Sequence, residues 1–309
     1  MIKKGVVYCS KGSIYRVKSE GEFYDCRIIG KFRIQGIKST NPVVVGDKVL
    51  FKIDPKEEGS IGVINEIEPR QNYIVRKSVN LSKQIHIIAS NIDQVFLMIT
   101  LKAPVTFPTF IDRFLVTAKA YEINAVLIFN KIDIYTLEEL YEVRALKSIY
   151  EKIGYTCYEV VANDKNTLGV IKEKMIQKVS MFSGHSGVGK STLVNTLSPE
   201  LDLKTGDISS QHDQGQHTTT FAQMFDLNKG ARIIDTPGIK GFGLVDIERE
   251  ELSGYFNEFS VLRKDCKFKN CMHTSEPHCA VKTALENHEI AESRYKSYLQ
   301  LLEEYALYR

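Results

Sequence analysis

The sequence lacks any apolar run long enough to cross a membrane. Its longest runs, Val95–Ile99 and Ala125–Phe129, have the size of single strands, whereas a membrane-spanning helix needs about 20 apolar residues. The opening segment MIKKGVVYCSKGSIYRV carries charges but no apolar stretch of the signal-peptide kind. Internal repeats and low-complexity tracts are also missing. We therefore expect a soluble, cytoplasmic protein that binds no membrane.

Cysteine is scarce outside one short segment. Cys9, Cys26 and Cys157 are scattered, and the other three of the six cysteines lie within fourteen residues near the C-terminus. For the scattered cysteines, burial as small apolar side chains is the ordinary explanation. Because cytosolic chains rarely form disulfides, the clustered cysteines favour a metal site.

The charge of the chain is small but uneven. With 309 residues, 43% of them hydrophobic and 26% charged, the chain is long enough for two or three domains. The net charge is +3, yet residues 1–77 hold 15 basic and 9 acidic side chains, so they contribute +6 and the rest −3. This asymmetry suggests an N-terminal end that faces nucleic acid. On charge alone, a solvated β-surface explains it equally well.

Residues 1–70 alternate short apolar and polar stretches, separated by glycine-containing turns. We expect five strands here: Gly5–Ser10, Ile14–Lys18, Phe23–Ile29, Val43–Ile53 and Ile61–Ile67. Five short strands at this spacing predict a small β-barrel. An OB-fold is the preferred interpretation and an SH3-like barrel the alternative, because the pattern alone does not distinguish them.

Residues 71–90 are interpreted as a linker, and from Asn91 strands alternate with helices, which is typical of a parallel α/β sheet. The expected strands are Val95–Thr100, Ala125–Asn130, Tyr155–Ala162, Val179–Gly184, Thr219–Leu227 and Arg232–Asp235. The expected helices are Thr109–Tyr121, Thr136–Ile153, Lys190–Leu197 and one long C-terminal helix, Ala280–Leu307. We place an α/β domain at 91–244 and a helical domain at 245–309.

Gly184–Ser191 reads GHSGVGKS, which matches the phosphate-binding pattern GxxxxGK[ST] between a predicted strand and a predicted helix. Backbone N–H groups of such a loop and the helix N-terminus attract phosphate oxygens. We expect Lys190 to reach the β- and γ-phosphates and the Ser191 hydroxyl to bind Mg²⁺. The expected phosphate contacts are Gly184, Ser186, Gly187, Val188, Gly189, Lys190 and Ser191.

Asn130-Lys131-Ile132-Asp133 reads as the guanine-specificity motif NKxD. Asp133 can accept hydrogen bonds from N1–H and N2–H₂ of guanine, which adenine does not offer, so the discrimination should be large. We expect Asn130 to brace the loop and the stem of Lys131 to cover the base. The backbone N–H of Ala162, which follows the next strand, is expected to reach guanine O6.

Asp235-Thr236-Pro237-Gly238 fits the switch II motif DxxG. We expect Asp235 to hold Mg²⁺ through a water and the Gly238 N–H to contact the γ-phosphate. A simple turn is the alternative interpretation. The strand before it and the phosphate loop upstream favour the switch.

The segment between these motifs is rich in small and polar residues and ends in His217-Thr218-Thr219-Thr220. Such a composition suits a loop that orders around a γ-phosphate. Thr219 is the first candidate for a Mg²⁺ ligand and Thr218 the second. Ile239 stands where Ras-like enzymes carry the glutamine that orients the attacking water. His217 is therefore the candidate catalytic residue; a surface-loop histidine is the alternative.

The motifs occur in an unusual order, since NKxD precedes the phosphate loop instead of following it. This order predicts a circularly permuted P-loop GTPase domain, with an additional domain at each end of the chain.

Cys266, Cys271, His273 and Cys279 form the pattern C-x4-C-x-H-x5-C. Three thiolates and one imidazole complete a closed, tetrahedral zinc site of the structural kind. His278 is an alternative ligand. The lysines around the cluster are compatible with an RNA-contacting knuckle.

Together, the barrel, the permuted motifs and the Cys-Cys-His-Cys cluster resemble the RsgA (YjeQ) family of bacterial circularly permuted GTPases that depend on the small ribosomal subunit. Gly215–Thr220 reads GQHTTT, close to the family's GRHTTT, with Gln216 where arginine is usual; His185 sits where proline is common. The resemblance implies an OB-fold at residues 1–70 and subunit-stimulated GTP hydrolysis in late small-subunit maturation. It also implies a catalytic role for His217.

We accordingly expect a monomer that binds the small subunit and its rRNA, GTP and GDP, with Mg²⁺ and one zinc. Two other readings stay open. In the first alternative, the chain is a GTP-dependent RNA-binding switch that does not act on ribosomes. In the second, it is a placeholder with little hydrolysis, as the isoleucine at position 239 suggests.

Overall fold

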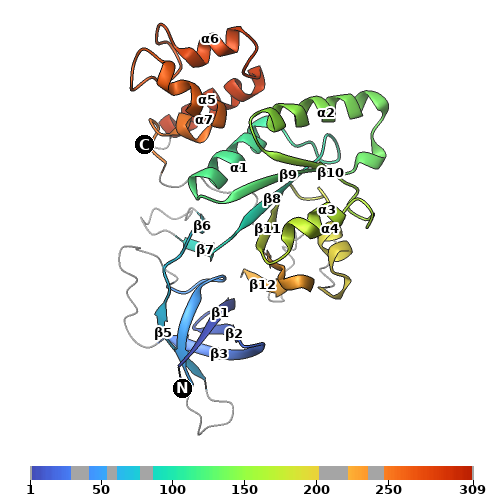
Figure 1. Ribbon diagram of the computed structural model, residues 1–309, viewed down its shortest axis with the longest axis vertical. Helices are drawn as coiled ribbons and strands as arrows, with labels where there is room; N and C mark the ends of the chain where they lie inside the picture. Colours follow the sequence, from blue (N-terminus) through green and yellow to red (C-terminus); the bar gives the residue numbers. More distant parts are fainter. Residues whose placement is uncertain are drawn as a thin grey trace.

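The computed structural model describes residues 2–28, 42–53, 61–76, 86–201, 222–235 and 247–307. A barrel lies at one end of the long axis, an α/β sheet lies in the middle, and the C-terminal helices lie at the other end (Figure 1). Among the described residues, no helix has both the length and the apolar character needed to cross a bilayer.

The N-terminal part is a closed five-stranded barrel. Its strands are β1 (Ile2–Lys11), β2 (Ile14–Ser19), β3 (Glu22–Ile28), β4 (Lys48–Lys52) and β5 (Gly62–Ile67). They pair in the order β1-β2-β3-β5-β4, and β4 closes the barrel on β1. Only the β3–β5 pair is parallel. This five-stranded barrel agrees with the predicted OB-fold.

The predicted strand Val43–Ile53 is too long, because β4 begins only at Lys48. Gly46 turns the chain with φ +93, and a Cβ at this position would lie 2.0 Å from the Ser90 carbonyl oxygen. Only glycine allows this backbone conformation and this close approach. The residues before the turn are buried but lie outside the strand.

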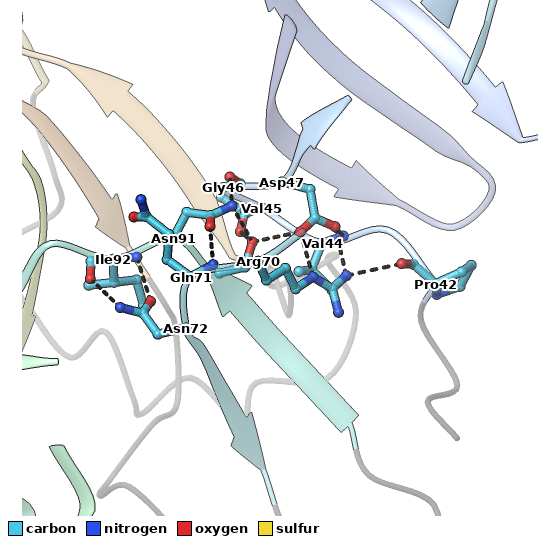
Figure 2. A network of polar contacts seen from close by, with 11 residues as sticks. Pro42, Val44, Val45, Gly46, Asp47, Arg70, Gln71, Asn72, Asn91 and Ile92 are labelled. Atoms are coloured by element: carbon cyan, nitrogen blue, oxygen red, sulfur yellow. Dashed lines mark hydrogen bonds and ion pairs between the residues drawn. The ribbon is translucent and has the colours of Figure 1, made fainter. Parts of the chain in front are cut away.

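A buried polar network joins the barrel to the segment after it (Figure 2). Asp47 is completely buried. Its carboxylate accepts two hydrogen bonds from Arg70, each of 2.7 Å, one from Ser90 Oγ at 2.7 Å and one from the Val44 N–H at 2.8 Å. A buried carboxylate is costly unless it is paired and hydrogen-bonded, and here both conditions are met.

The interpreted linker, residues 71–90, contains secondary structure of its own. Strands β6 (Tyr73–Arg76) and β7 (His86–Ser90) form an antiparallel pair. Directly after β7, the Asn91 side chain donates to the Gly46 carbonyl and accepts from the Gln71 N–H, each at 2.9 Å (Figure 2). The Asn91 side chain therefore joins both ends of the segment to the turn at Gly46, just before β4.

The central sheet has the strand order β10-β9-β8-β11-β13-β12. Its strands are β8 (Gln94–Ile99), β9 (Asn124–Phe129), β10 (Thr156–Glu159), β11 (Val179–Ser183), β12 (Gln223–Asp226) and β13 (Arg232–Asp235). All neighbours are parallel except β12, which is antiparallel to β13. Strand β12 also pairs with β1 at Gln223 and Cys9, so the sheet continues into the barrel.

Helices cover both faces of this sheet. Helices α1 (Pro108–Ala120) and α2 (Leu137–Lys152) pack on one face, and α3 (Gly169–Met175) and α4 (Lys190–Leu197) on the other. Strand β8 is buried along its whole length, as expected for a parallel strand between two helical layers. Helix α3 is a short element that the sequence pattern did not predict.

The prediction of one long C-terminal helix is wrong. The C-terminal helices are α5 (Asn257–Leu262), α6 (Ala280–Glu286) and α7 (Glu292–Leu307). After α6, His288 adopts a left-handed conformation with φ +61. The Glu289 N–H then bonds to the Ala284 carbonyl at 2.9 Å and the His288 N–H to the Leu285 carbonyl at 3.1 Å. This is the hydrogen-bond pattern that ends many helices.

The C-terminal helices dock on α1 through a buried ion network. Arg294 of α7 is 1% exposed and donates to Asp112 of α1 at 2.6 Å and to Glu258 of α5 at 2.7 Å. Tyr150 of α2 donates to the same aspartate at 2.8 Å. Removing one of these charged side chains would leave its partner buried without an opposite charge, which is strongly destabilising. The network therefore fixes the C-terminal helices on the sheet domain.

Candidate nucleotide site and metal centre

The loop between β11 and α4 is shaped by glycines. Gly184 has φ +142, and a Cβ on it would lie 2.7 Å from the Met98 carbonyl oxygen. Gly189 has φ +104, and a Cβ there would lie 2.5 Å from Asn130 Nδ2. Both positions require glycine. Helix α4 starts directly after them, so its free N–H groups face the loop, as in other anion-binding loops.

The ammonium group of Lys190 lies over this loop. Nζ donates to the carbonyl oxygens of Gly184 and His185, each at 2.7 Å. Burial lowers the pKa of Lys190, and the charge of Asp235 partly opposes this. Because a phosphate oxygen is a stronger acceptor than a neutral carbonyl, this ammonium can bind an anion held by the loop.

Asn130 joins segments that are far apart in the sequence. Its side chain is buried, and Oδ1 accepts a hydrogen bond from the Ala162 N–H at 2.9 Å while Nδ2 donates to the Val188 carbonyl at 2.8 Å. The NKxD loop, the loop after β10 and the phosphate loop thus meet at one side chain. The Asn130 side chain therefore links these three loops.

Lys131 precedes a short 3₁₀ turn, and Asp133 lies within it. Lys131 is left-handed with φ +65, and its Nζ donates to the Ala103 carbonyl. Asp133 lies in the 3₁₀ turn Ile132–Ile134 and is exposed. Within the described part of the chain its carboxylate makes no hydrogen bond or ion pair, so both oxygens are free to accept donors such as those on a guanine edge.

The two predicted Mg²⁺ ligands within the described residues lie at the carboxyl edge of the sheet. Ser191 is in the first turn of α4, and Asp235 is the last residue of β13. Strands β11 and β13 are paired and parallel, so the segments after them lie on the same edge. His217, Thr218, Thr219 and Gly238 lie outside the described residues.

The loop between β8 and α1 borders this site, a position that the sequence analysis did not predict. Tyr135 Oη accepts from the Leu101 N–H at 2.9 Å and donates to the Asn130 carbonyl at 3.1 Å. Pro104 Cδ lies 3.7 Å from where a Cβ on Gly187 would stand. The position of this loop could have been inferred from the predicted topology, because loops that follow neighbouring parallel strands lie at the same edge of the sheet.

The predicted metal ligands come together in the structure. The Sγ atoms of Cys266, Cys271 and Cys279 and a ring nitrogen of His273 all lie within 4.8 Å of one another. His273 Nδ1 is 3.6 Å from Cys266 Sγ and 3.3 Å from Cys279 Sγ. In a tetrahedral Cys₃His zinc site, neighbouring donor atoms are roughly 3.5 to 3.8 Å apart. The four side chains therefore fit a metal ion.

His273, and not His278, completes this group. Its backbone is held in a left-handed conformation with φ +57, and its carbonyl accepts a hydrogen bond from Tyr295 Oη of α7 at 2.7 Å. Tyr298 Oη donates to the Met272 carbonyl at 2.7 Å. Helix α7 thus fixes the loop that carries the imidazole.

Two family models match the chain, one described as RsgA GTPase over residues 67–245 and one as RsgA N-terminal domain over residues 4–61. The chain is 63% identical to the small ribosomal subunit biogenesis GTPase RsgA of Christiangramia forsetii, across 97% of this chain and 96% of the relative. It is 61% identical to the protein of the same name from Flavobacterium johnsoniae, across 97% and 92%.

Two solved structures share the whole architecture. The crystal structure of YjeQ from Thermotoga maritima matches with 37% identity and a TM-score of 0.80, covering 99% of each chain. YloQ, described as a circularly permuted GTPase, matches with 28% identity and a TM-score of 0.77, covering 100% of this chain and 96% of the other. The permuted order of motifs and the barrel in front of them are thus confirmed as features of one fold.

Proposed function

The chain belongs to the RsgA family of circularly permuted GTPases, and from this premise we propose that it hydrolyses GTP to GDP and phosphate on the small ribosomal subunit, late in the subunit's maturation. The observation that carries the nucleotide part is the position of Asn130, whose two hydrogen bonds bring three predicted nucleotide loops together. The names of the relatives support the ribosomal part.

In this proposal the phosphates bind to the loop after β11. Backbone N–H groups of the loop and the helix N-terminus contact the phosphate oxygens, and Lys190 turns from the loop carbonyls to the β- and γ-phosphates. Mg²⁺ is held by Ser191, Thr219 and Asp235, and it would neutralise charge on the transferred phosphoryl group. The proposed phosphate contacts are Gly184, Ser186, Gly187, Val188, Gly189, Lys190, Ser191 and Gly238.

The guanine base binds to the loops that Asn130 connects. Asp133 accepts the two donors of the guanine edge, the Ala162 N–H donates to O6, and the stem of Lys131 lies along the ring. The exposed carboxylate of Asp133 supports this assignment. The Ala162 N–H donates to Asn130 Oδ1 in this structure, so it would have to share this hydrogen with Asn130 to reach O6 as well. Adenine would leave the carboxylate without donors, which disfavours it.

We assign the activation of the attacking water to His217. An imidazole can orient a water or accept its proton near neutral pH, and Ile239 offers neither function where other GTPases carry glutamine. Stimulation by the subunit would then mean that His217 reaches its working position only on the ribosome.

We propose zinc for the Cys/His cluster. Three thiolates with one imidazole are typical of structural zinc, and four protein ligands leave no open position for a substrate. Bound zinc would hold the loop between α5 and α6 in place and supply no catalysis. We also propose that the chain is a monomer. We propose a cytoplasmic location because the proposed partner is a ribosomal subunit.

The test is GTP hydrolysis by the purified, zinc-loaded protein, alone, with small subunits and with large subunits. A large increase in rate with small subunits only is the expected result. Hydrolysis that no subunit stimulates would favour a GTPase working elsewhere. A rate no faster than that of GTP in water, with nucleotide binding intact, would favour a GTP-binding placeholder.

A further inference from the structure

One aromatic contact ties the phosphate loop to a helix of another segment. The imidazole of His185, the second residue of the loop, lies against Phe110 of α1 in a tilted arrangement, with ring centroids 4.0 Å apart and an angle of 31° between the planes. Both side chains are partly buried. Burial, and then the charge of Lys190, lowers the pKa of His185, which favours the neutral form of the ring in this contact.

The backbone of His185 is part of the phosphate site. Its carbonyl accepts the hydrogen bond from Lys190 Nζ at 2.7 Å, and it also accepts from the Val188 N–H at 3.4 Å. Whatever fixes the His185 ring therefore also fixes the start of the loop. A loop that is ordered before the ligand arrives binds more tightly, because less conformational entropy is lost on binding.

Helix α1, which carries Phe110, is the same helix on which the C-terminal helices dock. Thr109 bonds to Gln300 at 3.2 Å, Asp112 to Arg294 at 2.6 Å and Arg113 to Glu304 at 2.5 Å. The first turns of α1 are thus held from one side by α7, while Phe110 supports the phosphate loop. The position of Phe110 is therefore set by the domain interface.

We propose that His185 is a positioning residue for the phosphate loop, and that its ring contact with Phe110 holds the loop in the shape that binds nucleotide. The inference rests on the proposed function, because it assumes that this loop binds the phosphates of GDP and GTP.

A double-mutant cycle tests the contact. The affinity for a fluorescent GDP is measured for the wild type, Phe110→Leu, His185→Ala and the double variant. Each single substitution is expected to weaken binding roughly three- to tenfold, as the loss of an aromatic pair predicts. The double variant should bind no worse than the weaker single variant, because the second substitution removes a partner that is already gone.

Two further variants separate positioning from a general loss of structure. Phe110→Tyr keeps the ring and should retain wild-type affinity. Phe107→Leu changes an exposed phenylalanine just before the same helix and should leave affinity unchanged. Additive losses in the double variant, or equal or tighter binding by Phe110→Leu, would overturn the proposal. Absence of GDP binding by the wild type would instead contradict the proposed function.

Discussion

The proposed nucleotide site and the candidate metal centre of this protein are built in opposite ways. The nucleotide site collects loops from residues 130–133, 162, 184–191 and 235, and backbone groups and one buried asparagine hold them together. The metal centre takes four side chains from one segment, residues 266–279. The first site exists only when the whole sheet is folded, whereas the second needs a short loop and the helix that supports it.

This difference predicts how each site fails. Removing one of the four side chains from the candidate metal centre should unfold structure nearby, because a metal held there would link residues 266–279. Removing a side chain from the nucleotide site should cost binding or rate but leave the fold intact, because the sheet and its helices hold the loops. The following predictions test that contrast, from the largest expected effect to the smallest.

Cys271→Ser should abolish zinc binding and melt the C-terminal helical region. Metal-ligand binding of this kind contributes on the order of 10 kcal/mol to folding. Metal analysis and calorimetry measure the two effects. Cys157→Ser is the matched control, since Cys157 is also buried but lies outside the cluster; it should keep one zinc. Full zinc content in Cys271→Ser would contradict the assignment.

Lys190→Ala should lower the rate of GTP hydrolysis by about 10² to 10³-fold, because the variant loses a charge that stabilises the phosphoryl group in the transition state. Zinc content and melting temperature should not change. Hydrolysis is measured with saturating small subunits. Lys172→Ala removes an exposed lysine of α3 and serves as control. An unchanged rate in Lys190→Ala would show that the loop does not carry the reaction.

Asp133→Ala should lower the preference for GDP over ADP by roughly 10- to 100-fold, because paired hydrogen bonds to the guanine edge disappear. The loss should fall on GDP, while the weak affinity for ADP stays the same. Titration calorimetry with both nucleotides measures the ratio. If the affinities for GDP and ADP fell together, Asp133 would stabilise the structure of the site and would not recognise the guanine base.

Lys102→Ala should have the smallest effect. Lys102 pairs with Glu139 of α2 at 2.6 Å, with side chains that are 40% and 26% exposed. Ion pairs of this exposure contribute about 0 to 1 kcal/mol. The free energy of unfolding should therefore fall by about 1 kcal/mol at most, and the affinity for GDP should change by less than about fivefold. A larger loss of affinity would mean that the loop between β8 and α1 takes part in binding more directly than its contacts indicate.

The sequence predicted the parts of the fold that local chemistry determines. Helix Lys190–Leu197 and strand Arg232–Asp235 have the predicted limits, because a glycine-rich loop and a short apolar run mark them. All four metal ligands followed from spacing, since they lie in one segment. His273 was the predicted fourth member and His278 the alternative, and the structure brings His273 into the group.

What the sequence did not predict depends on tertiary contacts. Helix α6 is followed by His288 in a left-handed conformation. Glycine is the usual residue at this position, so the sequence carried no clear mark of the helix end. Strands β6 and β7 are short and lie in a segment that reads as a linker. The ring contact of His185 with Phe110 joins residues that are distant in the chain, and no local pattern encodes such a pair.

The most direct test of the account is the binding of GDP and ADP to the wild-type protein, measured by titration calorimetry with Mg²⁺ and zinc present. The account predicts one GDP site with an affinity at least about 100-fold higher than that for ADP, because Asp133 can pair with guanine only. Equal affinities, or no binding of GDP by folded protein, would contradict the claim that these distant loops form a guanine-nucleotide site.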